Sequence, residues 1–132
     1  MTVVVDSSAV VAALTSEQSD GEWARAVMRG EALAAPSHMH VEASNVMRRS
    51  VIAGHLGRDL AALMHDELVQ LRIQTFSFEP LASRIWALHP SVTAYDAAYV
   101  ALAEELDVPL LTLDRRLARA DGPTCTFLLP PG

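Results

Sequence analysis

Short uncharged runs alternate along the chain with longer segments whose apolar residues recur at helical spacing. The first run, Thr2–Val5, is continuously apolar, as expected for a strand that is buried on both faces of a parallel sheet. Similar runs, bounded by turn residues, predict strands at 2–5, 33–35, 73–78, 110–113 and 126–129. The segments between them predict helices at 9–14, 21–29, 37–53, 81–88, 92–106 and 115–120.

One further helix, between Gly57 and the third strand, is strongly amphipathic. Five of its apolar side chains fall at helical spacing, and we expect all of them to contact the core: Leu60, Leu63, Met64, Leu68 and Leu71. Strands that alternate with helices through short connections predict an α/β fold with helices on both faces of a parallel sheet. At 132 residues, without internal repeats or linkers, we expect residues 1–132 to form one domain.

The stretch from Thr93 to Asp114 contains the strongest chemical signal. Asp96 is the only charged residue between Val92 and Ala103, and a carboxylate inside so apolar a helix is costly unless something compensates its charge. One explanation is a helix cap, since Thr93 and Asp96 have the spacing of a capping box. The other is a site, because the following strand ends on Asp114 and can bring a second carboxylate into the same crevice.

Two more acids stand at similar places. Asp6 directly follows the first strand, where ligands of open α/β sheets bind, although a cap role is equally simple and Ser7 or Ser8 could also cap the next helix. Glu42 lies in the first turns of the helix predicted at 37–53, where a carboxylate is favourable for the helix by itself.

Composition narrows the class of protein. All ten basic residues are Arg, so a P-loop, which needs a Lys, is excluded in its usual form. The net charge is −6, and 51% of the residues are hydrophobic, which predicts a partner surface. A single cysteine, Cys125, excludes an internal disulfide. Without a signal peptide or membrane segment, we expect a soluble cytoplasmic protein that does not bind a membrane.

Carboxylates that converge in one crevice repel one another and need a cation or protons at neutral pH. Oxygen ligands without thiolates, and without a His pair at helical spacing, favour Mg²⁺ or Mn²⁺. The five His residues are scattered and match neither a zinc site nor an H-E-x-x-H pattern. The sequence therefore predicts a site for a hard divalent cation at Asp6, Glu42, Asp96 and Asp114.

Four short motifs in this order resemble a PIN-domain ribonuclease, and more narrowly the VapC-type toxins of bacterial toxin–antitoxin pairs. They are Asp6-Ser7-Ser8, Ala35-Pro36 with Glu42 and Asn45, Tyr95-Asp96-Ala97-Ala98-Tyr99, and Thr112-Leu113-Asp114. The resemblance implies a single PIN domain with a five-stranded parallel sheet whose first and fourth strands are adjacent. It also implies that Asp6, Glu42, Asp96 and Asp114 form the catalytic metal cluster, Glu42 directly or through water, with Thr112 and Ser7 as supporting hydroxyls.

The implied activity is hydrolysis of RNA phosphodiester bonds with Mg²⁺, for which Mn²⁺ can substitute, leaving a 5′-phosphate and a 3′-hydroxyl. The resemblance also implies a homodimer and a cognate VapB-type antitoxin as partner. A PIN module without activity, or a metal-dependent phosphohydrolase of small molecules, remains open as an alternative. Six arginines are candidates for RNA phosphate contacts: Arg48, Arg49, Arg84, Arg115, Arg116 and Arg119.

Overall fold

A computed structural model describes all 132 residues and has a sheet of five parallel strands at its centre. The strand order is β3-β2-β1-β4-β5. The first strand therefore lies in the middle of the sheet, and its carboxyl end adjoins that of β4, where Val5 pairs with Leu111. The strands are β1 (Thr2–Val5), β2 (Ala32–Pro36), β3 (Ile73–Phe76), β4 (Leu110–Leu111) and β5 (Phe127–Leu128).

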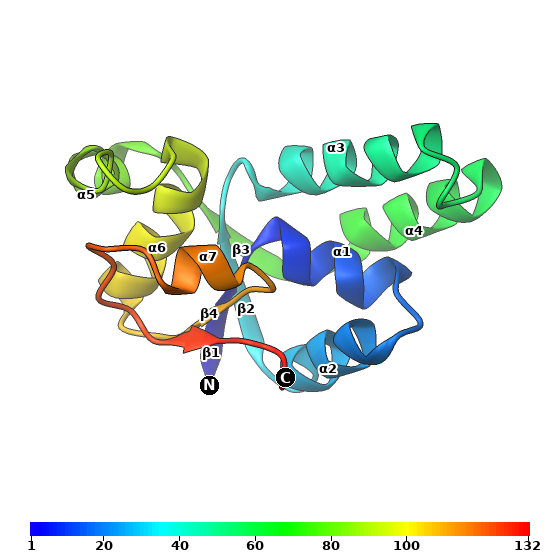
Figure 1. The fold of residues 1–132 in the computed structure, drawn as a ribbon, viewed down its shortest axis with the longest axis horizontal. Coiled ribbons are helices and arrows are strands. Elements are labelled where there is room, and N and C mark those ends of the chain that lie inside the picture. The colour runs from blue at the N-terminus through cyan, green and yellow to red at the C-terminus, as the bar shows by residue number, and fades with distance from the viewer.

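Helices cover both faces of the sheet, as the alternating pattern predicts. In Figure 1, α1 to α4 lie on one side of the strands and α5 and α6 on the other. The α-helices are α1 (Ser7–Thr15), α2 (Ser19–Met28), α3 (Met39–Ile52), α4 (Arg58–Gln70), α5 (Ala82–Ala87), α6 (Ala94–Leu106) and α7 (Arg115–Ala118), and a 3₁₀ turn, η1 (Glu79–Leu81), precedes α5. The expected α/β fold with a five-stranded parallel sheet is confirmed.

The core is built around β1 and α6. Val3, Val4 and Val5 are fully buried, and every residue from Ala97 to Ala103 is buried as well. Helix α6 contacts β1, β2 and β4 of the sheet as well as α5 and η1, so its middle is packed on more than one side, which explains its nearly uniform apolar composition. A carboxylate in the first turn of such a helix has its position fixed by the core.

Several strand bounds differ from the expectation. Strand β3 ends at Phe76 instead of Phe78, and β5 covers only Phe127–Leu128 of the predicted 126–129. Strand β4 ends at Leu111 instead of Leu113; the Thr112 N–H still donates to the Leu128 carbonyl at 3.1 Å, but the chain bends at Leu113. Pro36, expected to stop the second strand, is instead its last residue and pairs with Phe76. A proline is tolerated at this strand end, where its missing N–H interrupts no further ladder.

The expectation that all five apolar residues of α4 contact the core is wrong for two of them. Leu68 is buried, and Met64 and Leu71 are partly buried against the core, but Leu60 and Leu63 are 49% and 63% exposed. Helix α4 packs mainly on α1 and α3, and the pair α3 and α4 extends away from the sheet (Figure 1). A helix in this position buries a narrower stripe than its apolar pattern suggests.

The longest helix, α3, has 14 residues. A membrane-spanning helix needs roughly 20 apolar residues, and accordingly no helix here has the length and composition to cross a membrane.

Candidate functional site

The four predicted acids come together at the carboxyl edge of the sheet. Asp6 follows β1, Asp114 follows β4, and Glu42 and Asp96 stand in the first turns of α3 and α6. All four line one pocket of about 580 Å³. This volume is within the range of small-molecule and substrate sites, about 300–1,000 Å³, and nine of the 12 lining residues have polar or charged side chains. The lining also includes Ser7, Ser8, His38, Asn45, Arg49 and Tyr95.

Asp6 is both a helix cap and a pocket residue. Its Oδ1 accepts hydrogen bonds from the Ala9 N–H at 3.0 Å and from the Ser8 hydroxyl at 2.6 Å, so Asp6, and neither Ser7 nor Ser8, caps α1. Its Oδ2 accepts a hydrogen bond from the Thr112 hydroxyl. Asp6 is only 6% exposed, and burial raises its pKa from 3.8 to about 6 although the hydrogen bonds from Ser8 and Thr112 oppose the rise.

Glu42 is held by two hydroxyl groups from distant parts of the chain. The Ser7 hydroxyl donates to its Oε1 at 2.6 Å, and the Tyr99 hydroxyl donates to the same oxygen at 2.7 Å. Burial of Tyr99, and next its hydrogen bond to Glu42, raise the pKa of the phenol, so Tyr99 remains a donor at neutral pH. Ser7, predicted as a supporting hydroxyl, therefore contacts Glu42, whereas Thr112 contacts Asp6.

Asp96 is not the cap of its helix. Thr93 caps α6, with its Oγ1 accepting from the Asp96 N–H at 3.3 Å, and the Asp96 carboxylate makes no return hydrogen bond to the Thr93 backbone. Burial raises the pKa of Asp96, and the charges of Asp114 and Glu42 raise it further. The three carboxylates are thus close enough to repel one another.

Asp114 caps α7, because its Oδ1 accepts from the backbone N–H groups of Arg116 and Leu117 at 3.0 and 3.1 Å. Its own N–H donates to the Thr112 Oγ1 at 3.0 Å. Thr112 therefore links Asp6 and Asp114 through one hydroxyl. This link fixes the acids of β1 and β4 relative to each other.

The donor set fits a hard divalent cation. All four acids offer oxygen. Burial is the main cause of the raised pKa values of Asp6 and Asp96, and neighbouring carboxylates raise both further. No three His, Cys, Asp or Glu side chains already form an arrangement that could hold a metal ion. Hydroxyl and N–H donors instead occupy oxygens of Asp6, Glu42 and Asp114.

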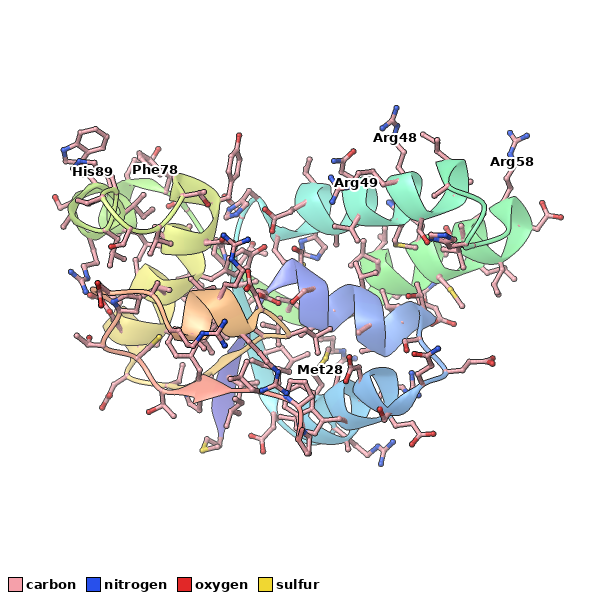
Figure 2. All side chains as sticks on the ribbon, viewed as in Figure 1. Met28, Arg48, Arg49, Arg58, Phe78 and His89 are labelled. Atoms are coloured by element: carbon pink, nitrogen blue, oxygen red, sulfur yellow. The ribbon has the colours of Figure 1, made fainter.

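Among the predicted arginines, Arg49 lines the acidic pocket. Arg48 lines a separate hollow of about 280 Å³ between α3 and α4, together with Arg58, which the sequence analysis did not single out. Figure 2 shows Arg48, Arg49 and Arg58 at the same end of the molecule, on α3 and α4. None of the three has a carboxylate within salt-bridge distance.

The remaining arginines do not line the pocket. Arg84 pairs with Glu104, its Nε lying 2.6 Å from Oε1, and donates to the Gly122 carbonyl at 2.9 Å. The guanidinium of Arg84 is therefore held by partners within the protein. Arg115 donates to the Pro130 carbonyl, and Arg116 and Arg119 are exposed on and beside α7.

Sequence reasoning missed two aromatic side chains and one imidazole at the site. Tyr95 lines the pocket and Tyr99 donates a hydrogen bond to Glu42. Of the two, only Tyr99, three positions after Asp96 in the helix, had a usable signal in the sequence. His38 lies between them, with ring centroids 6.1 Å from Tyr95 and 5.1 Å from Tyr99. Its Nε2 is 4.0 Å from the Glu42 Oε2, a relation that its i, i+4 spacing allows.

The comparisons with known proteins agree with one another on a single family. The family described as PIN domain matches residues 3–123. Ribonuclease VapC1 of Mycobacterium tuberculosis is 38% identical over 127 residues, which cover 96% of each chain. Ribonuclease VapC12 of the same species is 33% identical over 120 residues, covering 91% of this chain and 92% of that protein.

A solved structure shares the fold. VapBC2 from Rickettsia felis, bound to a DNA fragment from its promoter, superimposes with a TM-score of 0.70, covering 98% of each chain at 13% sequence identity. At this identity the similarity concerns the fold alone.

The raised pKa values predict how the metal-free protein responds to pH. The native state binds protons at Asp6 and Asp96 more tightly than the unfolded chain does, so this contribution to stability falls as pH rises. For Asp6 the fall extends from about pH 4 through about pH 6. For Asp6 the loss corresponds to about 3 kcal/mol. Asp96→Asn removes one of the repelling charges. In EDTA at pH 7 we therefore expect it to melt at the same temperature as the wild type or higher.

Thermal melts in EDTA and in Mn²⁺ test this expectation, with Glu105→Gln, an exposed charge on the same helix, as the control. Mn²⁺ should stabilise the wild type and the control, and should stabilise Asp96→Asn less. If Asp96 only supported a cap, the variant would lose about 0.5–2 kcal/mol in EDTA and keep the whole Mn²⁺ effect, which would contradict the site.

Proposed function

Because the chain belongs to the PIN domain family, we propose that it is an endoribonuclease that depends on Mg²⁺ or Mn²⁺ and acts as the toxin of a type II toxin–antitoxin pair. The 33–38% identity to ribonucleases named VapC, over nearly the whole chain, supports this proposal. The observation that carries it is the convergence of four carboxylates, from four separate elements, in one pocket that also contains Arg49.

In this proposal Asp6, Asp96 and Asp114 hold the divalent ion, and Glu42 does so directly or through water. A bound ion would supply Lewis-acid polarisation of the scissile phosphate and of the attacking water. Hydroxyl and N–H groups already donate hydrogen bonds to these carboxylates. Some of the carboxylates would therefore have to rotate when the ion binds. Rotation about the terminal bond of an Asp or Glu is soft enough for this.

The chain's own hydroxyl groups orient the acids. Ser7 and Tyr99 both donate to the Glu42 Oε1, which leaves its Oε2 to accept a hydrogen bond from water. Thr112 holds Asp6 and the backbone of Asp114 together. These bonds reduce the rotational freedom of the carboxylates, so fewer conformations have to be lost when substrate and ion bind.

Arg49 is the cation placed to contact an RNA phosphate. It lines the acidic pocket and has no carboxylate partner, so its guanidinium is free to form paired hydrogen bonds to a phosphate. Arg48 and Arg58 continue the same charge along α3 and α4 (Figure 2). These three arginines would supply phosphate contacts although the net charge of the chain is −6.

The proposal includes two protein partners. A cognate VapB-type antitoxin would place a basic side chain in the acidic pocket, where the charge is complementary. A second copy of the chain would cover apolar surface that the monomer leaves in water. Helices α3 and α4 carry five exposed apolar side chains, which support this homodimer: Val41, Ile52, Leu60, Leu63 and Val69.

We expect the purified protein to cleave RNA only when Mg²⁺ or Mn²⁺ is present, and Asp114→Asn to remove most of the activity. Asn caps a helix about as well as Asp, so the variant should keep its melting temperature. The loss of kcat/KM should exceed the about 10- to 100-fold that is typical for residues that only support a metal ligand. Full cleavage in EDTA, or products that end in a 2′,3′-cyclic phosphate, would contradict a metal-dependent hydrolysis.

We expect Arg49→Gln to raise KM for RNA more than it lowers kcat. Loss of one phosphate contact should also reduce the slope of log affinity against log salt by about 1. The matched control is Arg72→Gln, an exposed arginine that precedes β3 at the opposite edge of the sheet. Equal salt slopes for Arg49→Gln and the wild type, measured by fluorescence anisotropy with a labelled RNA, would exclude Arg49 from the phosphate contacts.

A further inference from the structure

A second pocket, largely apolar, adjoins the acidic one. Its volume is about 240 Å³, and His38 and Tyr95 line both pockets. The two side chains therefore form a shared wall between the acids and an apolar surface. The apolar pocket is also lined by Pro36, Leu81, Ile85 and Ala98, which are buried, and by Phe78, which is exposed.

The two aromatic side chains at the rim are unusually exposed for their type. Tyr95 is 68% and Phe78 is 58% exposed. Phe78 lies at the α5 end of the molecule, opposite the arginines of α3 and α4 (Figure 2). Exposed aromatic rings beside a polar cleft are typical of surfaces that bind a ligand.

We propose that the apolar pocket receives one unstacked nucleobase of the RNA, next to the scissile phosphate, and that Phe78 is a specificity-determining residue. The inference rests on the proposed nuclease function. Single-stranded RNA is recognised chiefly through splayed bases that stack on aromatic side chains. The two pockets share a wall. When the phosphate of a nucleotide lies against the acids, the base of that nucleotide or of the next one can therefore reach the apolar pocket.

The size of the pocket suits one nucleobase, and two residues of its otherwise apolar lining are polar. The pocket is smaller than the about 300–1,000 Å³ of typical small-molecule sites, so it suits one ring system. Ser37 and His38 add polar groups to the lining. The His38 Nε2 has no hydrogen-bond partner and lies 4.0 Å from the Glu42 Oε2, so this atom belongs to the wall that the two pockets share. The edge of a base can satisfy such polar groups, whereas a leucine or phenylalanine side chain cannot.

The experiment compares wild type, Phe78→Ala and Phe78→Trp on a set of synthetic RNA hairpins. The cut is first mapped on a hairpin with a randomised loop. Substrates then carry each of the four bases, or an abasic nucleotide, at the two positions that flank the cut. Trp86→Ala is the control, because Trp86 is 70% exposed and lines neither pocket. Thermal melts check that each variant is folded.

For the wild type, kcat/KM should fall by about 5- to 100-fold when the base at one flanking position is removed. For Phe78→Ala, kcat/KM on the intact RNA should be lower than that of the wild type by a similar factor, and removal of the base should lower it little further. This variant should also discriminate less among the four bases. Phe78→Trp should retain the preference, since it keeps an aromatic face, and Trp86→Ala should behave as the wild type.

Three results overturn the inference. The first is a wild type that cleaves intact and abasic RNA equally well. The second is a Phe78→Ala loss of the same size on both substrates. The third is Phe78→Ala cleavage that matches the wild type on every RNA, because Phe78 would then contact no base. These leave the nuclease function standing; a folded wild type that cleaves no RNA in Mg²⁺ or Mn²⁺ would overturn that function and the inference with it.

Discussion

Four carboxylates share one edge of the sheet, and their mutual repulsion has to be offset for the chain to fold. The fold offsets it with neutral donors: Ser8 and Thr112 donate to Asp6, and Ser7 and Tyr99 donate to Glu42. Hydroxyl groups satisfy the oxygens without cancelling the charge, so the negative potential of the pocket is retained. A lysine or arginine paired with each acid would stabilise the protein more and leave little attraction for a divalent ion.

The backbone geometry needed for this arrangement could be predicted from the sequence because it depends on local pattern. A buried first strand that ends on Asp6, and a short strand leading to Asp114, place two acids at the carboxyl edge of any parallel sheet. The apolar composition around Asp96 predicts a helix packed on more than one side, and the residues of α6 from Ala97 to Ala103 are all buried. All four candidate acids line the same pocket.

What the sequence could not supply are contacts between side chains far apart in the chain. The hydrogen bond from Tyr99 to Glu42 spans 57 positions, and the pairing of Arg84 with Glu104 becomes evident only once α5 and α6 are packed together. Helical spacing likewise predicted a buried Leu60 and Leu63, but how much of α4 is covered depends on how far it extends from the sheet. Such contacts are set by tertiary packing and leave no periodic signal.

The pKa of Asp6, measured with and without Mg²⁺, tests the metal site most directly. Carboxyl ¹³C resonances followed by NMR through a pH titration report this value for the individual side chain. Without metal, Asp6 should titrate near pH 6, because burial disfavours its charged form. With saturating Mg²⁺ the pKa should fall below its ordinary value of 3.8, since a bound cation favours the carboxylate. A pKa that stays near 6 at every Mg²⁺ concentration would contradict the account.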